Sequence, residues 1–200
     1  MEIRTIVLTG GPCGGKSSVL AHLKEVFAAD ATFVDEAATV ILQRHGLPHP
    51  TWGDREWEEL QQRIIRTQLA WEQEGFSNAR KYGHRASVCD RGLEDDAAYP
   101  MGEASLRHLV GPDRHNRLAR YDLVLHLPSL AVTNPGRYEL LCQGNLGRYE
   151  SVAEAVEQEN RTLAAWAGHP NRVILKSTSI EQLAQECVSY LRLVVLSPTT

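Results

Sequence analysis

The stretch of sequence that decides the fold is Ile3-Arg4-Thr5-Ile6-Val7-Leu8-Thr9-Gly10-Gly11-Pro12-Cys13-Gly14-Gly15-Lys16-Ser17. It begins with an apolar run typical of a buried strand and ends with the spacing G-x-x-x-x-G-K-[ST], from Gly10 to Ser17. Apolar residues then recur at the spacing of one helix face, at Val19, Leu20, Leu23, Val26 and Phe27. A glycine-rich loop between a strand and a helix is the setting in which this spacing holds phosphates.

Each part of the loop predicts a contact with a polyphosphate. Glycines let backbone N–H groups turn toward an anion, and the helix that begins near Lys16 adds the positive end of its dipole. We expect Lys16 to bind the outer phosphates and the Ser17 hydroxyl to hold Mg2+. For Cys13 we expect a backbone contribution, with a redox role of its thiol as the alternative. The predicted nucleotide-binding residues are Gly11, Pro12, Cys13, Gly14, Gly15, Lys16, Ser17 and Ser18.

Composition narrows the class of protein. The chain has 200 residues, which suits one domain with a full core. Its formal net charge of −4 argues against the broad basic surface of a nucleic-acid carrier, although a local basic groove is compatible with it. The four cysteines form no C-x-x-C pair, which favours reduced thiols in a cytoplasmic protein. We see no leader sequence, and the apolar run 6–8 is too short to span a membrane.

Strand and helix patterns alternate along the rest of the chain. We expect further strands at 31–34, 86–89, 121–127 and 172–175, and helices at 37–46, 54–80, 150–167 and from 180 onward. Residues 93–120 look helical but broken, and 130–149 look irregular. This alternation predicts an α/β fold, with a parallel sheet covered by helices on both faces. Ligands of such sheets bind at the carboxyl ends of the strands.

Charged residues stand at two of these strand ends. Asp90 follows the third strand, where it can hold Mg2+ directly or through water; the alternative is a cap on the next helix. Arg91 can clamp a phosphate or position an acceptor, or it can form a surface salt bridge. Glu36 ends the second strand, where a carboxylate can accept a proton from an acceptor hydroxyl. Its neighbour Asp35 is an alternative for that role, and both can instead cap a helix.

The segment at about 130–150 has the composition of a lid. It carries Arg137 and Arg148 among hinge-forming residues such as Asn134-Pro135-Gly136. Such a segment can bring either arginine onto phosphates as charge develops, whereas the alternative is an ordinary surface loop. Trp52 and Trp57 flank the expected acceptor side, where they either stack on a base or pack in the core.

Four stretches resemble a known family: residues 10–17, Val34-Asp35-Glu36-Ala37-Ala38, Cys89-Asp90-Arg91-Gly92-Leu93-Glu94-Asp95-Asp96-Ala97-Ala98-Tyr99 and Tyr121-Asp122-Leu123-Val124. They are similar to the P-loop ATP-binding family, usually labelled an AAA domain, that includes NadR-like ribosylnicotinamide kinases. The resemblance implies a three-layer P-loop NTPase fold with a five-stranded parallel sheet in the order 2-3-1-4-5 and a helical lid. It also implies Lys16 and Ser17 on ATP and Mg2+, and Glu36 as the base.

These observations together predict an ATP- and Mg2+-dependent kinase, formed by one domain over residues 1–200, that acts on a small nucleoside- or nucleotide-like acceptor. The predicted catalytic residues are Lys16, Glu36, Asp90, Arg91 and Arg137, and the predicted Mg2+ ligands are Ser17 and Asp90. One alternative is a nucleotide-switched binding protein, with slow ATP or GTP hydrolysis and a lipid or protein partner. Another is a polynucleotide 5′-hydroxyl kinase. The sequence leaves open the acceptor, the choice between ATP and GTP, and the oligomeric state, a homodimer included.

Overall fold

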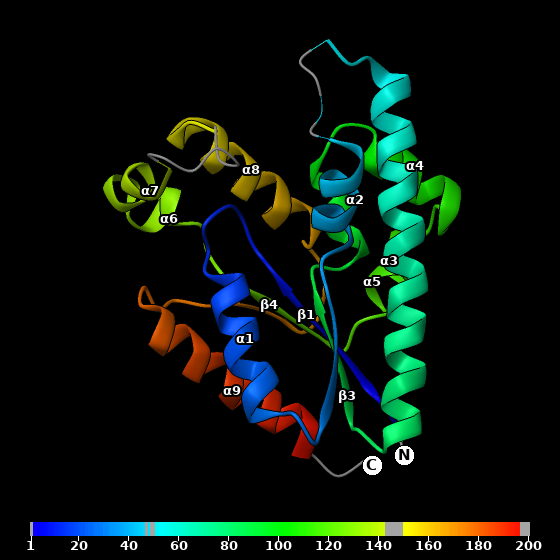
Figure 1. Ribbon diagram of the computed structural model, residues 1–200, viewed down its shortest axis with the longest axis vertical. Coiled ribbons are helices and arrows are strands. Elements are labelled where there is room, and N and C mark those ends of the chain that lie inside the picture. Colours follow the sequence, from blue (N-terminus) through cyan, green and yellow to red (C-terminus); the bar gives the residue numbers. More distant parts are fainter. Residues whose placement is uncertain (1, 47, 49–50, 143–149, 197–200) are drawn as a thin grey trace.

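A parallel sheet forms the centre of the molecule (Figure 1). The computed structural model describes residues 2–46, 48, 51–142 and 150–196. Five strands lie within these ranges: β1 (Arg4–Thr9), β2 (Ala31–Val34), β3 (Ala86–Asp90), β4 (Leu123–His126) and β5 (Arg172–Ile174). They pair in the order β2-β3-β1-β4-β5, and every pair is parallel. The predicted α/β fold and the strand order that the resemblance implied are therefore confirmed.

The central strand β1 pairs on both of its sides. Ile6 is in register with Val88 of β3 and with Leu123 of β4. Ile6, Val7 and Leu8 are all fully buried, because helices cover both faces of the sheet and side chains that point either way meet a packed layer. This two-sided burial explains why the strand is a continuous apolar run in the sequence.

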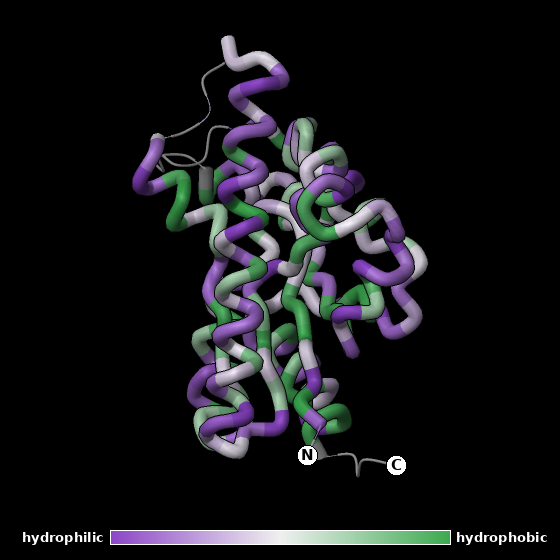
Figure 2. Tube along the Cα trace, turned by 90° about the vertical axis from the view of Figure 1, so that its right-hand side faces the viewer, coloured by the Kyte–Doolittle hydropathy of each residue, from purple (hydrophilic) through white to green (hydrophobic). Residues whose placement is uncertain are grey.

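Helices cover the sheet from both sides. On one face α1 (Lys16–Val26) and α9 (Ile180–Leu196) pack against each other, and their buried leucines join those of the strands in one cluster. On the other face the long helix α3 (Asp54–Tyr82) lies over β2 and β3 (Figure 1). In Figure 2, purple and green turns alternate along α3, as expected of a helix with one apolar face.

The shorter elements complete the layers around the sheet. They are α2 (Ala37–His45), the 3-10 helix η1 (Leu93–Ala98), α4 (Gly102–Leu109), α5 (Arg114–Leu118), α6 (Leu130–Thr133), α7 (Pro135–Cys142) and α8 (Val152–Ala165). Of these, α2, α6, α7 and α8 lie toward the same end of the molecule as the loop that follows β1 (Figure 1). No helix in the described ranges is both long and apolar enough to cross a membrane.

The segment predicted to be irregular, 130–149, is helical where the structure describes it. The Ser129 hydroxyl caps α6 by accepting the Ala131 N–H, and Pro135 begins α7. The prediction was wrong because proline is favoured at the first position of a helix, where its missing N–H removes no hydrogen bond. Arg148, the second candidate for the lid arginine, lies outside the described residues.

Candidate functional site

The loop from Gly10 to Ser17 is held by close contacts that only glycine permits. Gly10 has a φ of +134°, and a Cβ added there would lie 2.0 Å from the carbonyl oxygen of Leu127, just after β4. A Cβ on Gly11 would lie 2.4 Å from the Oε2 atom of Glu159 on α8. The loop is therefore pressed between the end of a strand and a helix, with no room for a side chain at these two positions.

Lys16 lies across this loop. Its Nζ donates to the carbonyl oxygens of Gly10 at 2.8 Å and of Gly11 at 2.9 Å. Burial, together with the positive charge of Arg91, lowers the pKa of Lys16 to about 8. The ammonium group is thus held at the loop by weak backbone acceptors, from which a phosphate with full negative charge can draw it away.

Asp90 is the last residue of β3 and carries an orphaned carboxylate oxygen. The residue is only 9% exposed, and its buried Oδ1 has no hydrogen-bond partner among the described residues. Burial and the negative charge of Glu36 raise the pKa of Asp90 to about 6. Asp90 Oδ1 thus lies beside the phosphate loop with no partner from the described ranges, and the Ser17 hydroxyl lies at the start of α1. These two oxygen ligands fit a hydrated Mg2+ ion.

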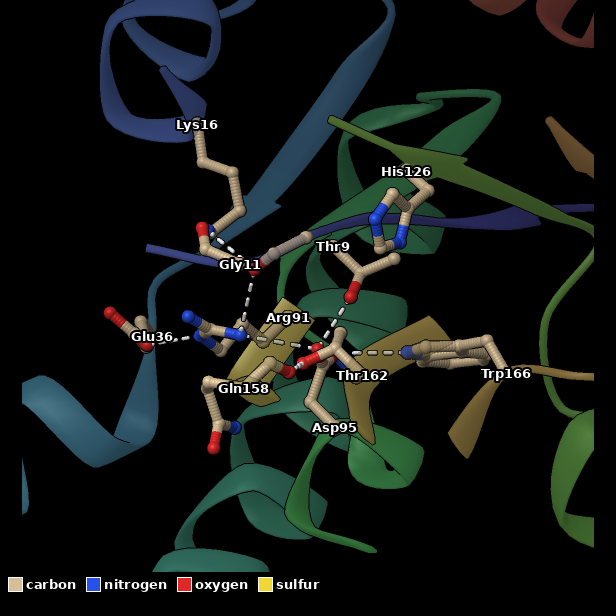
Figure 3. A network of polar contacts seen from close by, with 12 residues as sticks. Thr9, Gly11, Lys16, Glu36, Arg91, Asp95, His126, Gln158, Thr162 and Trp166 are labelled. Carbon is tan, nitrogen blue, oxygen red and sulfur yellow. Dashed lines mark hydrogen bonds and ion pairs between the residues drawn. The ribbon is translucent and has the colours of Figure 1, made fainter. Parts of the chain in front are cut away.

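Arg91 and Glu36 form the polar centre beside the loop (Figure 3). The Arg91 Nε donates to Glu36, while its Nη1 reaches the Gly10 carbonyl oxygen at 3.4 Å and Asp95 at 3.2 Å. Arg91 adopts a φ of +65°, which is rare for a residue with a side chain. The side chain of Arg91 is only 16% exposed, so its ion pair with Glu36 is not the surface salt bridge that the sequence offered as the alternative.

Glu36, and not Asp35, faces this centre. Burial raises the pKa of Glu36, but the Arg91 charge and a hydrogen bond from Thr39 outweigh that effect and leave the pKa below its ordinary value. Asp35 points to the surface, where it pairs with Lys24 at 2.8 Å and its side chain is 69% exposed. Neither side chain caps α2, since Glu36 stands at the cap position without making the capping hydrogen bond.

Asp95 connects Arg91 to the rest of the fold, and the sequence did not single it out. Its carboxylate accepts hydrogen bonds from the Thr9 hydroxyl, the Gly92 N–H and the Trp166 indole N–H, besides that from Arg91 (Figure 3). The end of β1, the start of η1 and the end of α8 are therefore joined at one buried group. Asp95 fixes the orientation of the Arg91 guanidinium.

Helix α8 contributes a second group that the sequence did not single out. Glu159 Oε2 accepts the Gly11 N–H at 2.7 Å, and Glu159 Oε1 lies 2.8 Å from Nε2 of the buried His126. Burial raises the pKa of Glu159, but the contact with His126 outweighs it and keeps the pKa below its ordinary value. The adjacent Gln158 has an Nε2 atom that is buried without a hydrogen-bond partner among the described residues.

A small pocket opens next to the Glu36–Arg91 pair, between α2, α3 and η1. Its volume is about 30 Å³, and it is lined by Glu36, Ala37, Ala38, Ile64, Gln68, Arg91, Gly92, Asp95, Asp96 and Tyr99. Trp52 and Trp57 do not line it. They pack edge to face, with ring centroids 5.9 Å apart, beside the apolar contacts of α2 with α3, as the core-packing alternative expects.

Arg137 lies apart from this polar centre. It is exposed on α7, and its backbone N–H donates to the Asn134 side chain at 3.1 Å. Hydrogen bonds at the start of α9 lower the pKa of Glu181, and the Arg137 charge adds to that effect. The positive charge of Arg137 therefore acts on the first turn of α9, the helix that follows the loop 176–179.

The fold and the loop define the class of protein. The central strand β1 of a parallel sheet in the order 2-3-1-4-5 leads into a glycine loop that ends with lysine and serine, and helix α1 follows. This arrangement defines a P-loop nucleotide-binding domain. A family model described as AAA domain matches residues 5–183, and the chain belongs to this family. No curated protein matches the chain.

Proposed function

We propose that the protein is an ATP- and Mg2+-dependent kinase that transfers a phosphoryl group to a small nucleoside- or nucleotide-like acceptor. The observation that carries this proposal is the pocket beside the phosphate loop. Arg91 contacts the loop at the Gly10 carbonyl oxygen and also lines the pocket together with Glu36. A protein that only hydrolyses ATP needs no separate pocket at this place, because its second substrate is water.

Each predicted residue has a task in such a transfer. Lys16 moves from the loop carbonyls to the outer phosphates, and Ser17 and Asp90 hold Mg2+, which neutralises phosphate charge when bound. Glu36, whose pKa lies below its ordinary value, positions the acceptor hydroxyl and takes its proton. Arg91 stabilises the charge on the transferring group. Because phosphoryl transfer depends mainly on positioning and charge, these groups suffice without a covalent intermediate.

Two broader features complete the proposal. Helices α6 and α7, over residues 130–142, belong to the lid of a single domain, and Arg137 is its cation. The adenine base of ATP lies near the loop 176–179, where the start of α9 faces the lid. Cytoplasmic location and the oligomeric state are not needed for the chemistry.

A nucleotide-switched binding protein is the second candidate function, and one observation favours it. The pocket volume of about 30 Å³ is room for about one or two water molecules, so a nucleoside-sized acceptor requires residues that line the pocket to move. If no such movement takes place, the bound nucleotide changes the conformation of the loop and lid without transferring its phosphoryl group.

Radiolabelled ATP with a panel of nucleosides, nucleotides and RNA 5′ ends separates these functions. We expect label on a small acceptor, none with Lys16→Ala, and a turnover at least tenfold lower with Glu36→Gln at unchanged ATP affinity. Asp35→Asn is the matched control, because Asp35 is the exposed neighbour, and it should behave as wild type. Label on inorganic phosphate alone would favour the second candidate, and full turnover of Glu36→Gln would remove the assigned base.

A further inference from the structure

Two adjacent carboxyl groups of η1 differ completely in their surroundings. Asp95 accepts four hydrogen bonds, from the residues described above. Asp96 lines the pocket and is only 8% exposed, and its carboxyl oxygens make no hydrogen bond within the described part of the chain, although they are not among the side-chain atoms that are completely closed to solvent. A carboxyl group that faces a pocket without a protein partner can form a hydrogen bond with a ligand there, and its near burial makes that hydrogen bond count more than one on an open surface.

The charges around Asp96 leave it uncompensated. The charges that act on it most strongly are those of Asp95, Arg91, Glu72 and Glu36, of which three are acids. The one cation among them is already paired with Glu36 and Asp95. Glu72 is held separately by Gln68, Arg120 and Tyr121. Burial and the Asp95 charge raise the pKa of Asp96 well above its ordinary value, so the carboxyl group is readily protonated in the absence of a ligand.

Asp96 also lies away from the phosphate loop. Arg91 and Asp95 contact each other and Arg91 reaches the Gly10 carbonyl oxygen, whereas no hydrogen bond between described residues joins Asp96 to the loop. The charge of Glu72 on α3 also acts on Asp96. Glu36 and Asp96 thus line one pocket, with Glu36 on the side of the transferred phosphoryl group. An acceptor that presents one hydroxyl to Glu36 presents another part of itself to Asp96.

The geometry points to Asp96 as the specificity-determining residue of the acceptor pocket: it binds a hydrogen-bond donor of the acceptor, a hydroxyl or an amino group, and rejects an acceptor that carries a phosphate at that end. The inference rests on the proposed kinase function. Three carboxyl groups and one guanidinium line the pocket, so a phosphate there meets an excess of negative charge. The narrow volume of about 30 Å³ admits only a small group.

Calorimetric titration tests this inference. The four ribonucleosides and their 3′-monophosphates, which keep the 5′-hydroxyl free for Glu36 and carry the phosphate on the other side of the ribose, are titrated into protein that already holds Mg2+ and a non-hydrolysable ATP analogue. We expect at least one nucleoside to bind, and its monophosphate to bind at least tenfold more weakly. In Asp96→Asn the nucleoside affinity should fall at least tenfold and the difference between nucleoside and monophosphate should narrow, because the substitution removes the charge. The affinity for the ATP analogue should stay within twofold, as it should for the surface variant Asp35→Asn.

The outcomes separate the two proposals. A preference for the monophosphate in the wild type, or unchanged affinities in Asp96→Asn, overturns the role of Asp96 and leaves the kinase proposal standing. Binding of the ATP analogue with no acceptor bound at all overturns the kinase proposal and the role of Asp96 with it.

Thermal unfolding distinguishes a ligand-facing Asp96 from a structural one. Because folding raises the pKa of this carboxyl group, the wild type loses stability relative to Asp96→Asn as pH rises above the ordinary pKa of aspartate, about 4. We expect Asp96→Asn to melt at the same or a higher temperature than wild type at pH 8, and Asp95→Asn to melt lower. A melting temperature that falls in both variants alike shows that Asp96 is structural and overturns the inference.

Discussion

At the scale of single residues, Lys16 and Arg91 both donate to the carbonyl oxygen of Gly10. Two cations that share one acceptor repel each other, and this repulsion adds to burial in lowering the pKa of Lys16 to about 8. A bound triphosphate supplies the negative charge that this place lacks. Nucleotide binding should therefore favour the charged form of Lys16 and take up a proton at alkaline pH.

This coupling predicts how ATP affinity depends on pH. Below pH 8 Lys16 is charged in the free protein, and the affinity should be constant; above pH 8 it should fall by up to about tenfold per unit, because the bound state then needs a proton that the free state lacks. Calorimetry with a non-hydrolysable analogue from pH 7 to 9.5 measures it. Lys16→Arg keeps its charge and should lose the dependence. A flat wild-type profile contradicts the assignment.

The residues that the sequence pointed to differ from those that it missed in whether their neighbours in the sequence mark them. Lys16, Asp90 and Arg91 belong to a motif or to a strand end, so their neighbours in the sequence mark them. Asp95 lies in the acidic run 94–96, which looks like a solvated face although the residue is 3% exposed. Glu159 contacts a residue 148 positions earlier in the chain, and the local sequence carries no signal for that contact.

At the scale of secondary structure, α8 is the helix that holds the phosphate loop in place, through a hydrogen bond with Gly11. Glu159 joins the Gly11 N–H to His126 at the end of β4, while Ala155 of the same helix packs with Ala131 and Tyr138 of α6 and α7. The partly buried Cys13 of the loop packs against this cluster too. One helix therefore contacts α6, α7 and the loop.

Removal of the Glu159 carboxylate should lower the stability of the protein and weaken the contact between α8 and the phosphate loop. Glu159→Ala leaves the Gly11 N–H and the His126 ring buried without their partner, which costs about 3 kcal/mol of the free energy of unfolding and weakens ATP binding. Urea unfolding at pH 7 measures the first effect. Because the pKa of Glu159 is lowered, its stabilisation is present above its unfolded pKa and is lost as pH falls through the folded pKa. Glu157→Ala, an exposed pair with Arg161, should change stability by less than about 1 kcal/mol.

The same contact sets the requirement for glycine at position 11. Gly11→Ala places a methyl group against Glu159 and should lower ATP affinity at least tenfold, since the loop must shift away from α8. Gly136→Ala is the matched control: no atom lies within 4 Å of the added Cβ on α7, and alanine favours a helix. Titration with the ATP analogue compares the two variants. Equal affinities would show that the loop tolerates the displacement.

At the scale of the whole molecule, the phosphate loop separates two regions. The pocket with Glu36, Arg91 and Asp96 lies on the side of α2 and α3, while the start of α9, with Arg137 of α7 near it, lies on the other. The alternation of strands and helices in the sequence predicted the sheet that creates these regions. It did not predict the helices α6 and α7, because the Asn-Pro-Gly signal at 134–136 is shared by turns and by helix starts.

A lid that closes over the nucleotide predicts a distinct effect of Arg137. The side chain is exposed near Glu181, so it contributes little to folding, and its charge becomes useful only when α7 moves toward the phosphates. Arg137→Ala should therefore lower kcat at least tenfold, leave the affinity for the ATP analogue within about threefold, and leave the melting temperature unchanged. Arg161→Ala removes a comparably exposed arginine from α8 and should leave kcat unaltered. Steady-state kinetics on the acceptor found by the radiolabel assay measures both variants. If Arg137→Ala turns over at the wild-type rate, α7 carries no catalytic cation and closure of the lid contributes only by excluding water.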